Sequence, residues 1–428
     1  FCAFLVGAVP AVAAPLGAGE ARAVAAEVVR LVQAHYVIPE RRAAIVAAVN
    51  SSLAAGRYDV AERDEFAARI TEDLRAAGQD RHLYVADDPA GFEDLRRAGG
   101  EGVASGPSPR RQAMGRRRHQ GFEEMRILDG NVRYARISGF LWSDDTTGRI
   151  VDEVARFLDE GDAVVIDLRH NGGGDASPVE RLISYFMAPD GRVLMTFHDG
   201  LTGETSINRV ANDLSGSRMV GRPLYVLIDQ GTASAAEEFA YHVQQFKLGQ
   251  LVGANTAGAG NNNELFPAAA GFVASVSVGR PEHPVSKSNW EGTGIAPDVA
   301  VPPETALDEA HLLALRGLAK NAADDDRVGI EWTMTGLEAR LHPPTVAARD
   351  LKAYAGHYGV RTVWLDKETL AYQREGRPAT TLIPMAPDLF AFPDTGDVRV
   401  RFRRHGGKVV GFDQITVDGQ VIPSERTD

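Results

Sequence analysis

Residues 163–174, AVVIDLRHNGGG, decide the fold because they join a continuous apolar run to a turn of three glycines. An apolar run of this kind is typical of a strand that is buried on both faces of a parallel sheet. Residues 223–239, PLYVLIDQGTASAAEEF, repeat the arrangement of apolar strand, tight turn and helix. Strands that alternate with helices in this way predict an α/β core whose strands are at least partly parallel.

The alternation extends on both sides of these two segments. Apolar and polar residues alternate over 269–279, which predicts a half-buried strand, and a further strand is expected at 132–137. Helices are expected at residues 147–158, 178–187, 235–246 and 306–321.

The regions before and after the core have different sequence patterns. Apolar residues at three- and four-residue spacing predict a helical domain before the core, and short strand signals separated by Gly, Pro and Asp predict a small antiparallel β domain after it. The predicted division is a signal segment (1–20), an N-terminal helical domain (21–90), a flexible basic loop (91–121), the α/β core (122–305), a helix and polar linker (306–345) and the β domain (346–428).

Composition narrows the classes of function. The 428 residues carry a formal net charge of -12, which argues against nucleic acid as the main partner. A single cysteine excludes a disulfide scaffold and a thiolate zinc site. Residues 1–15 form an apolar run that ends in small side chains before a proline, as in a cleaved export signal, and the run is too short to span a bilayer. We therefore expect an exported protein, periplasmic or extracellular, without stable membrane insertion.

The glycine turn at residues 171–174 leaves backbone N–H groups uncovered by side chains. Such amides bind an anion, which is either a phosphate or the oxyanion of a tetrahedral intermediate. The sequence fits neither the P-loop pattern nor the dinucleotide-binding pattern, and a purely structural turn is an alternative.

Ser234 lies where the second turn becomes a helix. With Glu237 three residues later, it fits a capping box that only stabilises the helix. The same geometry would also point a nucleophilic hydroxyl out of the strand end and place the Ala235 amide beside it.

A nucleophilic serine needs a base, and several histidines are candidates. His82 follows a turn at residues 78–81 and starts a short strand, whereas His242 lies within the helix that Ser234 begins. His170 and His283 are expected in loops. Glu291, near the end of the core, is a candidate for the carboxylate that orients the imidazole.

Four motifs, in this order, resemble peptidase family S41, the tail-specific or C-terminal processing peptidases. They are DLRHNGGG at 167–174, GTASAAE at 231–237, GANTAGAG at 253–260 and EGTGIAPD at 291–298. The processing branch of the family has a lysine 25 residues after its serine, and Ala259 occupies that position here. The chain is more similar to the branch of the tricorn core and interphotoreceptor retinoid-binding protein, without a PDZ domain.

That resemblance implies a ClpP/crotonase-like ββα core and a catalytic triad of Ser234, His82 and Glu291. It also implies an oxyanion hole from the amides of Gly173 and Ala235, with Gly172 as the other candidate in the first turn. The last segment is similar to small lipocalin-like domains.

The expected function is therefore that of an exported serine endopeptidase that acts on peptides or unfolded proteins through an acyl-enzyme. No cofactor, metal ion or nucleic acid is expected, and the sequence does not specify the oligomeric state. Two alternatives are a non-catalytic carrier of an apolar ligand, as in the retinoid-binding relatives, and thioester chemistry as in crotonase relatives.

Overall fold

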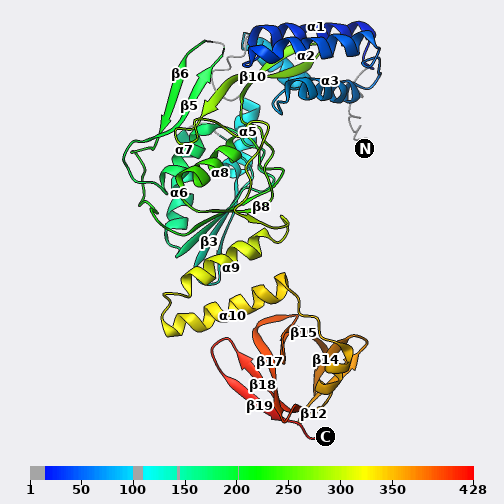
Figure 1. Cartoon of the computed structure of the whole chain (residues 1–428), viewed down its shortest axis with the longest axis vertical. Helices are drawn as coiled ribbons and strands as arrows, with labels where there is room; N and C mark the ends of the chain where they lie inside the picture. Colours follow the sequence, from blue (N-terminus) through cyan, green and yellow to red (C-terminus); the bar gives the residue numbers. More distant parts are fainter. Residues whose placement is uncertain (1–14, 100–108, 142–144, 201) are drawn as a thin grey trace, which may run out of the picture.

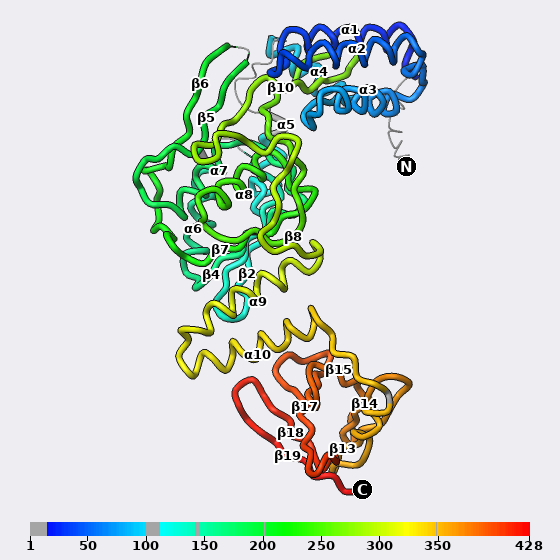
Figure 2. Tube along the Cα trace, viewed as in Figure 1, coloured from blue at the N-terminus to red at the C-terminus, as the bar shows by residue number. Residues whose placement is uncertain are grey.

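The computed structural model describes residues 15–99, 109–141, 145–200 and 202–428. Three regions follow one another along an elongated molecule, with the N-terminal helices at one end and the C-terminal sheet at the other (Figures 1 and 2). The predicted export signal falls mostly on residues 1–14, which lie outside the described residues. Among the described helices, none is both long enough and apolar enough to cross a membrane.

The N-terminal region is a bundle of helices that packs on a sheet. Its elements are α1 (Ala18–His35), α2 (Pro39–Ala54), α3 (Arg63–Gly78), β1 (Tyr84–Asp87) and α4 (Pro89–Arg97). The predicted apolar stripe of α1 is buried and shares one hydrophobic cluster with residues of β10 (Phe272–Glu282). Strand β1 pairs with β10 antiparallel, so the N-terminal region is joined to the core by backbone hydrogen bonds as well as by side chains.

The core holds a six-stranded sheet with the order β11-β8-β7-β4-β3-β2. All neighbouring pairs are parallel except β2 with β3. The strands are β2 (Phe122–Leu128), β3 (Val132–Ile137), β4 (Ala163–Asp167), β7 (Leu224–Ile228), β8 (Gln250–Gly253) and β11 (Val299–Ala300). The helices that cover it are α6 (Asp145–Asp159), α7 (Ala176–Ser184), α8 (Ala235–Phe246), α9 (Ala306–Leu318) and α10 (Asp324–Leu341).

Strand β4 is buried on both faces, as its apolar run predicts. Val164 and Ile166 belong to the cluster that contains residues of α6, α7 and α8, whereas Ala163 and Val165 belong to the cluster that contains residues of α9 and α10. Alternate residues of a strand point to opposite faces, so this division shows one helical layer on each side of the sheet.

A second sheet lies between the N-terminal helices and the core. Its order is β1-β10-β5-β6, with β9 also paired to β10, and every pair is antiparallel. The added strands are β5 (Val193–Asp199), β6 (Thr205–Arg209) and β9 (Asn262–Ala269). This sheet brings residues near position 82 and residues 261–282 to one region of the molecule.

Residues 91–121 differ from the predicted flexible loop, because the described parts are partly helical. Asp88 caps α4 by accepting a hydrogen bond from the Gly91 amide, and Pro89 occupies the first turn, where proline is tolerated. Helix α5 (Pro109–Arg117) and the 3-10 turn η1 (His119–Gly121) precede β2. Residues 100–108 are outside the described residues.

The C-terminal region is an antiparallel sheet whose eight strands follow one another in order, and it has its own hydrophobic cluster. The Thr427 amide, just after the last strand, donates to the His357 carbonyl of the first strand, so the sheet nearly closes on itself. The elements are α11 (Ala348–Leu351), η2 (Lys352–Tyr354), β12 (Gly356–Tyr358), β13 (Arg361–Asp366), β14 (Thr369–Arg374), β15 (Thr380–Ala386), β16 (Leu389–Phe392), β17 (Thr395–His405), β18 (Lys408–Thr416) and β19 (Val421–Glu425).

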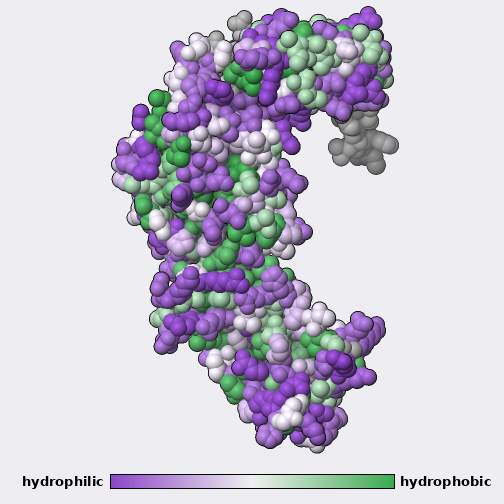
Figure 3. Space-filling model, in the orientation of Figure 1, coloured by the Kyte–Doolittle hydropathy of each residue, from purple (hydrophilic) through white to green (hydrophobic). Residues whose placement is uncertain are grey.

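The predicted α/β core with N-terminal helices and a C-terminal antiparallel sheet is thus confirmed, while the ClpP/crotonase kinship stays a prediction. Figure 3 shows that the molecule is curved, so that its two end regions project to the same side. The face in view is mostly hydrophilic, with hydrophobic residues in scattered areas.

Candidate active site

The turns after β4 and β7 lie side by side at the carboxyl edge of the six-stranded sheet. The Thr232 hydroxyl donates to the Leu168 carbonyl at 2.8 Å, and the Ala233 amide donates to the Asn171 carbonyl at 2.9 Å. The carboxyl ends of parallel strands are where α/β sheets place their ligands. Both sequence motifs singled out above therefore meet at one place.

Ser234 has an unusual backbone conformation, with φ 55° and ψ -123°. This region is costly for a residue with a Cβ, and such strain persists only where the surrounding structure enforces it. The Ser234 side chain makes no cap hydrogen bond to α8. Its hydroxyl is therefore not used for helix capping. This differs from the capping box in which Ser234 would only stabilise the helix.

The other half of the predicted capping box is present. The buried Glu237 carboxylate accepts hydrogen bonds from the Ser234 amide at 3.0 Å and from the amides of Gly258 and Ala259 at 2.7 and 2.8 Å. The Thr256 hydroxyl also donates to it, at 2.5 Å. Glu237 thus ties the turn that carries Ser234 to the glycine-rich segment 253–260.

The first glycine turn packs directly on Ser234. A Cβ added at Gly173, where φ is +99°, would come within 2.6 Å of the Ser234 Cβ. The Gly173 amide already donates to the Asn171 side-chain oxygen at 2.9 Å. By contrast, within the described residues the amides of Gly174 and Ala235 donate no hydrogen bond, and both residues line a cavity with Ser234. Gly174 is therefore a candidate donor that the sequence reasoning missed.

His82, from the N-terminal region, and Glu291, near the end of the core, are brought together. A ring nitrogen of His82 and carboxylate oxygens of Glu291 and Asp80 all lie within 4.8 Å of one another. His82 Nδ1 and Glu291 Oε1 are buried and have no hydrogen-bond partner. The other Glu291 oxygen accepts from the amides of Gly260 and Asn261, both at 2.7 Å.

Asp80 is a member of this cluster that the sequence reasoning did not single out. It is buried, and its carboxylate accepts a hydrogen bond from the His82 amide at 2.9 Å and another from the Asn261 side chain at 3.0 Å. The sequence signal was the carboxylate two residues before His82, a spacing at which a side chain commonly bonds the backbone of a turn.

Burial and charge shift the titration of this cluster. Burial raises the pKa of Glu291 to about 7, with a further contribution from the negative charge of Asp80. Burial lowers the pKa of His82, and Asp80 partly opposes that effect. The imidazole is therefore neutral at neutral pH, which is the form that accepts a proton.

Gly260 and Asn261 connect this cluster with Ser234. Both residues bind Glu291 through their amides, and both also line the cavity that contains Ser234. Among the described residues, no hydrogen bond joins Ser234 to His82. Hydrogen bonds between catalytic groups are commonly long in a free enzyme and tighten when substrate binds.

The other candidate histidines lie elsewhere or are differently occupied. The His170 side chain is 74% exposed and lies 3.0 Å from an oxygen of Asp229. His242 and His283 are buried against one another, with ring centroids 5.3 Å apart. None of these three histidines lines the cavity that contains Ser234, and neither does His82, which differs from them by lying beside the Glu291 carboxylate.

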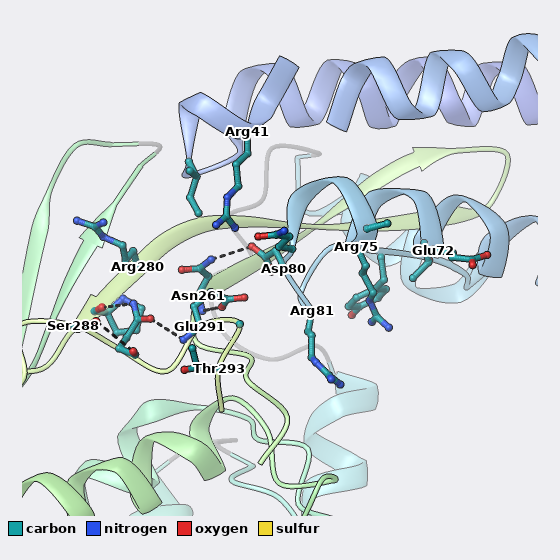
Figure 4. A pocket seen from close by; sticks show the side chains of 18 of the residues that line it. Arg41, Glu72, Arg75, Asp80, Arg81, Asn261, Arg280, Ser288, Glu291 and Thr293 are labelled. Carbon is teal, nitrogen blue, oxygen red and sulfur yellow. Dashed lines mark hydrogen bonds between the residues drawn. The ribbon is translucent and has the colours of Figure 1, made fainter. Parts of the chain in front are cut away.

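A large groove of about 1570 Å³ opens beside the cluster, between the N-terminal helices and the core (Figure 4). Figure 4 shows Asp80, Asn261 and Glu291 together in this groove, with Arg41 and Arg280 above and beside them. Much of its lining is charged, and includes Arg41, Glu72, Arg75, Asp80, Arg81, Arg280, Glu282, Lys287 and Glu291. Its size suits an extended peptide more than a small apolar molecule.

The same side chains have ligand atoms for a metal ion. Among the described residues, Asp80, His82 and Glu291 are the one group of three whose donor atoms are close enough to hold an ion. An imidazole and a carboxylate at this spacing are also what a serine hydrolase requires, so the arrangement does not by itself favour a metal.

Comparisons with known proteins agree with the motifs. The model described as peptidase family S41 matches residues 131–301, and the model described as the N-terminal domain of Peptidase_S41 in eukaryotic IRBP matches residues 19–103. The carboxyl-terminal-processing protease of Synechocystis sp. is 31% identical over 172 residues, which are 40% of this chain and 38% of that protein. The enzyme of the same name from Picosynechococcus sp. is 29% identical over 174 residues, 40% of each chain.

The chain therefore spans about two fifths of the length of these curated relatives. Among solved structures, a lipoprotein from Streptococcus agalactiae aligns with 72% of this chain and 100% of its own, at 18% identity and a TM-score of 0.46. The photosystem II D1 C-terminal processing protease aligns with 67% of this chain and 94% of its own, at 18% identity and a TM-score of 0.40.

Proposed function

Because the chain belongs to peptidase family S41, we propose that it is a serine endopeptidase in which Ser234, His82 and Glu291 carry out acyl transfer to water. One observation carries the proposal: Ser234 sits on a strained turn with its hydroxyl unused for capping, next to the segment that binds Glu291. An N-cap serine would have neither property.

In the proposed reaction, Ser234 attacks the carbonyl carbon of a peptide bond while His82 accepts the hydroxyl proton. Glu291 stabilises the imidazolium that forms, and His82 then returns the proton to the leaving amine. In the second half of the reaction, water attacks the acyl carbon while His82 accepts its proton, and His82 then returns that proton to the Ser234 oxygen as the acyl group leaves. No oxidant, nucleotide or metal takes part in these steps.

For the oxyanion we propose the amides of Ala235 and the glycine turn. Gly173 lies closest to Ser234, but its amide would have to leave Asn171 to donate. The Gly174 amide needs no such exchange and lines the same cavity. Each donor of this kind contributes about 3 kcal/mol to transition-state stabilisation in other hydrolases.

We further propose that the substrate is an extended peptide or unfolded protein that lies in the charged groove, and that the enzyme acts after export. The charged lining supports a peptide over the apolar ligand of a carrier protein, because charged groups that face an apolar ligand would lose hydration without a partner. The apolar run at residues 1–15 supports export.

The test is the variant Ser234→Ala. We expect it to lower turnover of unstructured peptides by at least about 1000-fold and to abolish labelling by a serine-directed phosphonate. Ser288→Ala, which changes another serine of the groove region, is the matched control for labelling and should still react with the phosphonate. Treatment with EDTA should leave turnover unchanged. Turnover that survives in Ser234→Ala, or that is lost with EDTA, would contradict the proposed mechanism.

A further inference from the structure

Glu238 lies one helical turn after Ser234 on α8, and the proposed reaction does not use it. Its side chain is only 7% exposed, and it lines a cavity of about 120 Å³ that also contains Ser234 and Ala235. Within the described part of the chain, its carboxylate takes part in no hydrogen bond. A carboxylate this deep in a protein is costly unless something pairs with it.

The surroundings of Glu238 supply no cation. Among the described residues, the basic group paired with Glu238 is His242, whose Nε2 lies 3.5 Å from a Glu238 oxygen. His242 is fully buried, and burial lowers its pKa to about 3, so the ring is neutral and supplies no counter-charge. Asp175 and Glu180 add negative charge near Glu238. Burial raises the pKa of Glu238 to about 8, with a further contribution from the negative charge of Asp175, so the carboxyl of the free protein holds its proton near neutral pH and would lose it when a cation pairs with it.

The walls of the cavity are suited to a long side chain. Phe197, Pro281 and Trp290 provide apolar surface in the cavity that Ser234 and Glu238 also line, and three asparagines, 261 to 263, add amide groups. The methylene groups of lysine or arginine pack on apolar surface while their charged end seeks a polar partner. A basic side chain matches both features, and a leucine or alanine side chain matches only the first.

We propose that this cavity is the primary specificity pocket of the peptidase, and that it selects a lysine or arginine on the acyl side of the scissile bond, with Glu238 as its charge partner. The inference rests on the proposed function, because it needs a substrate carbonyl at Ser234. From that carbonyl, the side chain of the same residue enters the cavity past Ser234 and meets Glu238. The ion pair forms away from water, where charge-assisted hydrogen bonds are strong.

The experiment compares kcat/KM for peptides that differ only at this position. Lysine and arginine peptides should exceed the methionine peptide, which is similar in length but neutral, by at least about 30-fold, and a glutamate peptide should be the poorest. In Glu238→Gln the lysine-to-methionine ratio should fall to near one. Glu180→Gln, a nearby carboxylate outside the cavity, is the matched control and should keep the ratio within about threefold of the wild type.

The outcomes separate this inference from the proposed function. A wild-type enzyme that prefers methionine, or a Glu238→Gln variant that loses the same factor on every peptide, would overturn the pocket assignment while leaving the serine mechanism intact. Binding of product peptides to Ser234→Ala gives a readout without turnover. That variant should bind a lysine-ended peptide at least tenfold more tightly than a methionine-ended one, and equal affinities would also overturn the inference.

Discussion

The Asp80 carboxylate acts on both halves of the imidazole–carboxylate pair. It bonds the His82 backbone, and its negative charge raises the pKa of Glu291 and opposes the lowering of the pKa of His82. Two carboxylates and one imidazole within 4.8 Å cannot ionise independently. The pH dependence of the peptidase should therefore report on Asp80, a residue of the groove that takes no part in the proposed proton transfers.

We expect kcat/KM to rise with pH through about 7, because below that pH Glu291 is protonated and cannot stabilise the imidazolium. Asp80→Asn removes a negative charge, which lowers the pKa of Glu291 and that of His82, so the rise should move to lower pH. The measurement is a pH profile of kcat/KM. Glu338→Gln, an exposed carboxylate paired with Arg316, should leave the profile unchanged. A rise that moves to higher pH in Asp80→Asn would contradict this account.

The proposed catalytic residues were identified from the sequence through motifs, and not through their spacing. His82 and Glu291 are more than 200 positions apart, and only the pairing of β1 with β10 and the folding back of segment 260–261 bring them together. The sequence reasoning did not single out Glu238, because nothing in the neighbouring sequence shows that this face of α8 is buried.

Among the elements, those with strong local signals were predicted closely. Strand β3 and helix α8 have the predicted bounds, since each combines a clear apolar pattern with a turn or cap at its ends. Strands β5 and β6 were missed because their residues are only partly buried and show no clear alternation. Residues 324–326 were expected in the polar linker. They instead form the first turn of α10, where three aspartates favour a helix N-terminus.

The two glycines at positions 172 and 173 give a matched pair of tests of the turn that supports Ser234. Gly173→Ala places a methyl group within 3 Å of Ser234, the Ala233 carbonyl and the Ala235 amide, at a φ of +99°. We expect it to cost about 1–3 kcal/mol of unfolding free energy and to lower kcat by at least about 100-fold, because the nucleophile must shift.

Gly172→Ala is the control, since nothing lies within 4 Å of an added Cβ there. Its free energy of unfolding should stay within about 0.5 kcal/mol of the wild type. Urea unfolding and kcat measured on both variants check the prediction. Equal losses in the two variants would show that the close contact between Gly173 and Ser234 is not what positions the nucleophile.

At the scale of the whole molecule, the C-terminal sheet has a hydrophobic cluster of its own and meets the rest of the chain mainly through α10. Trp332 on this helix donates from its indole nitrogen to the Gly396 carbonyl at 2.9 Å. The Arg399 guanidinium stacks 3.8 Å from the Trp332 ring and donates to the Trp332 carbonyl at 2.5 Å. Trp332 is thus one point at which the β domain is held to α10.

Trp332→Ala should uncouple the two regions without affecting chemistry. Loss of the cation–π contact and of the indole hydrogen bond removes roughly 2–3 kcal/mol of coupling, so we expect the β domain to melt separately from the core in calorimetry. Arg401→Ala, an exposed change on the same strand as Arg399, should not alter the melting profile. Phosphonate labelling of Ser234 should persist in Trp332→Ala, because the hydrophobic clusters around the active site do not include the β domain. A loss of labelling would instead mean that the distant sheet supports the geometry at Ser234.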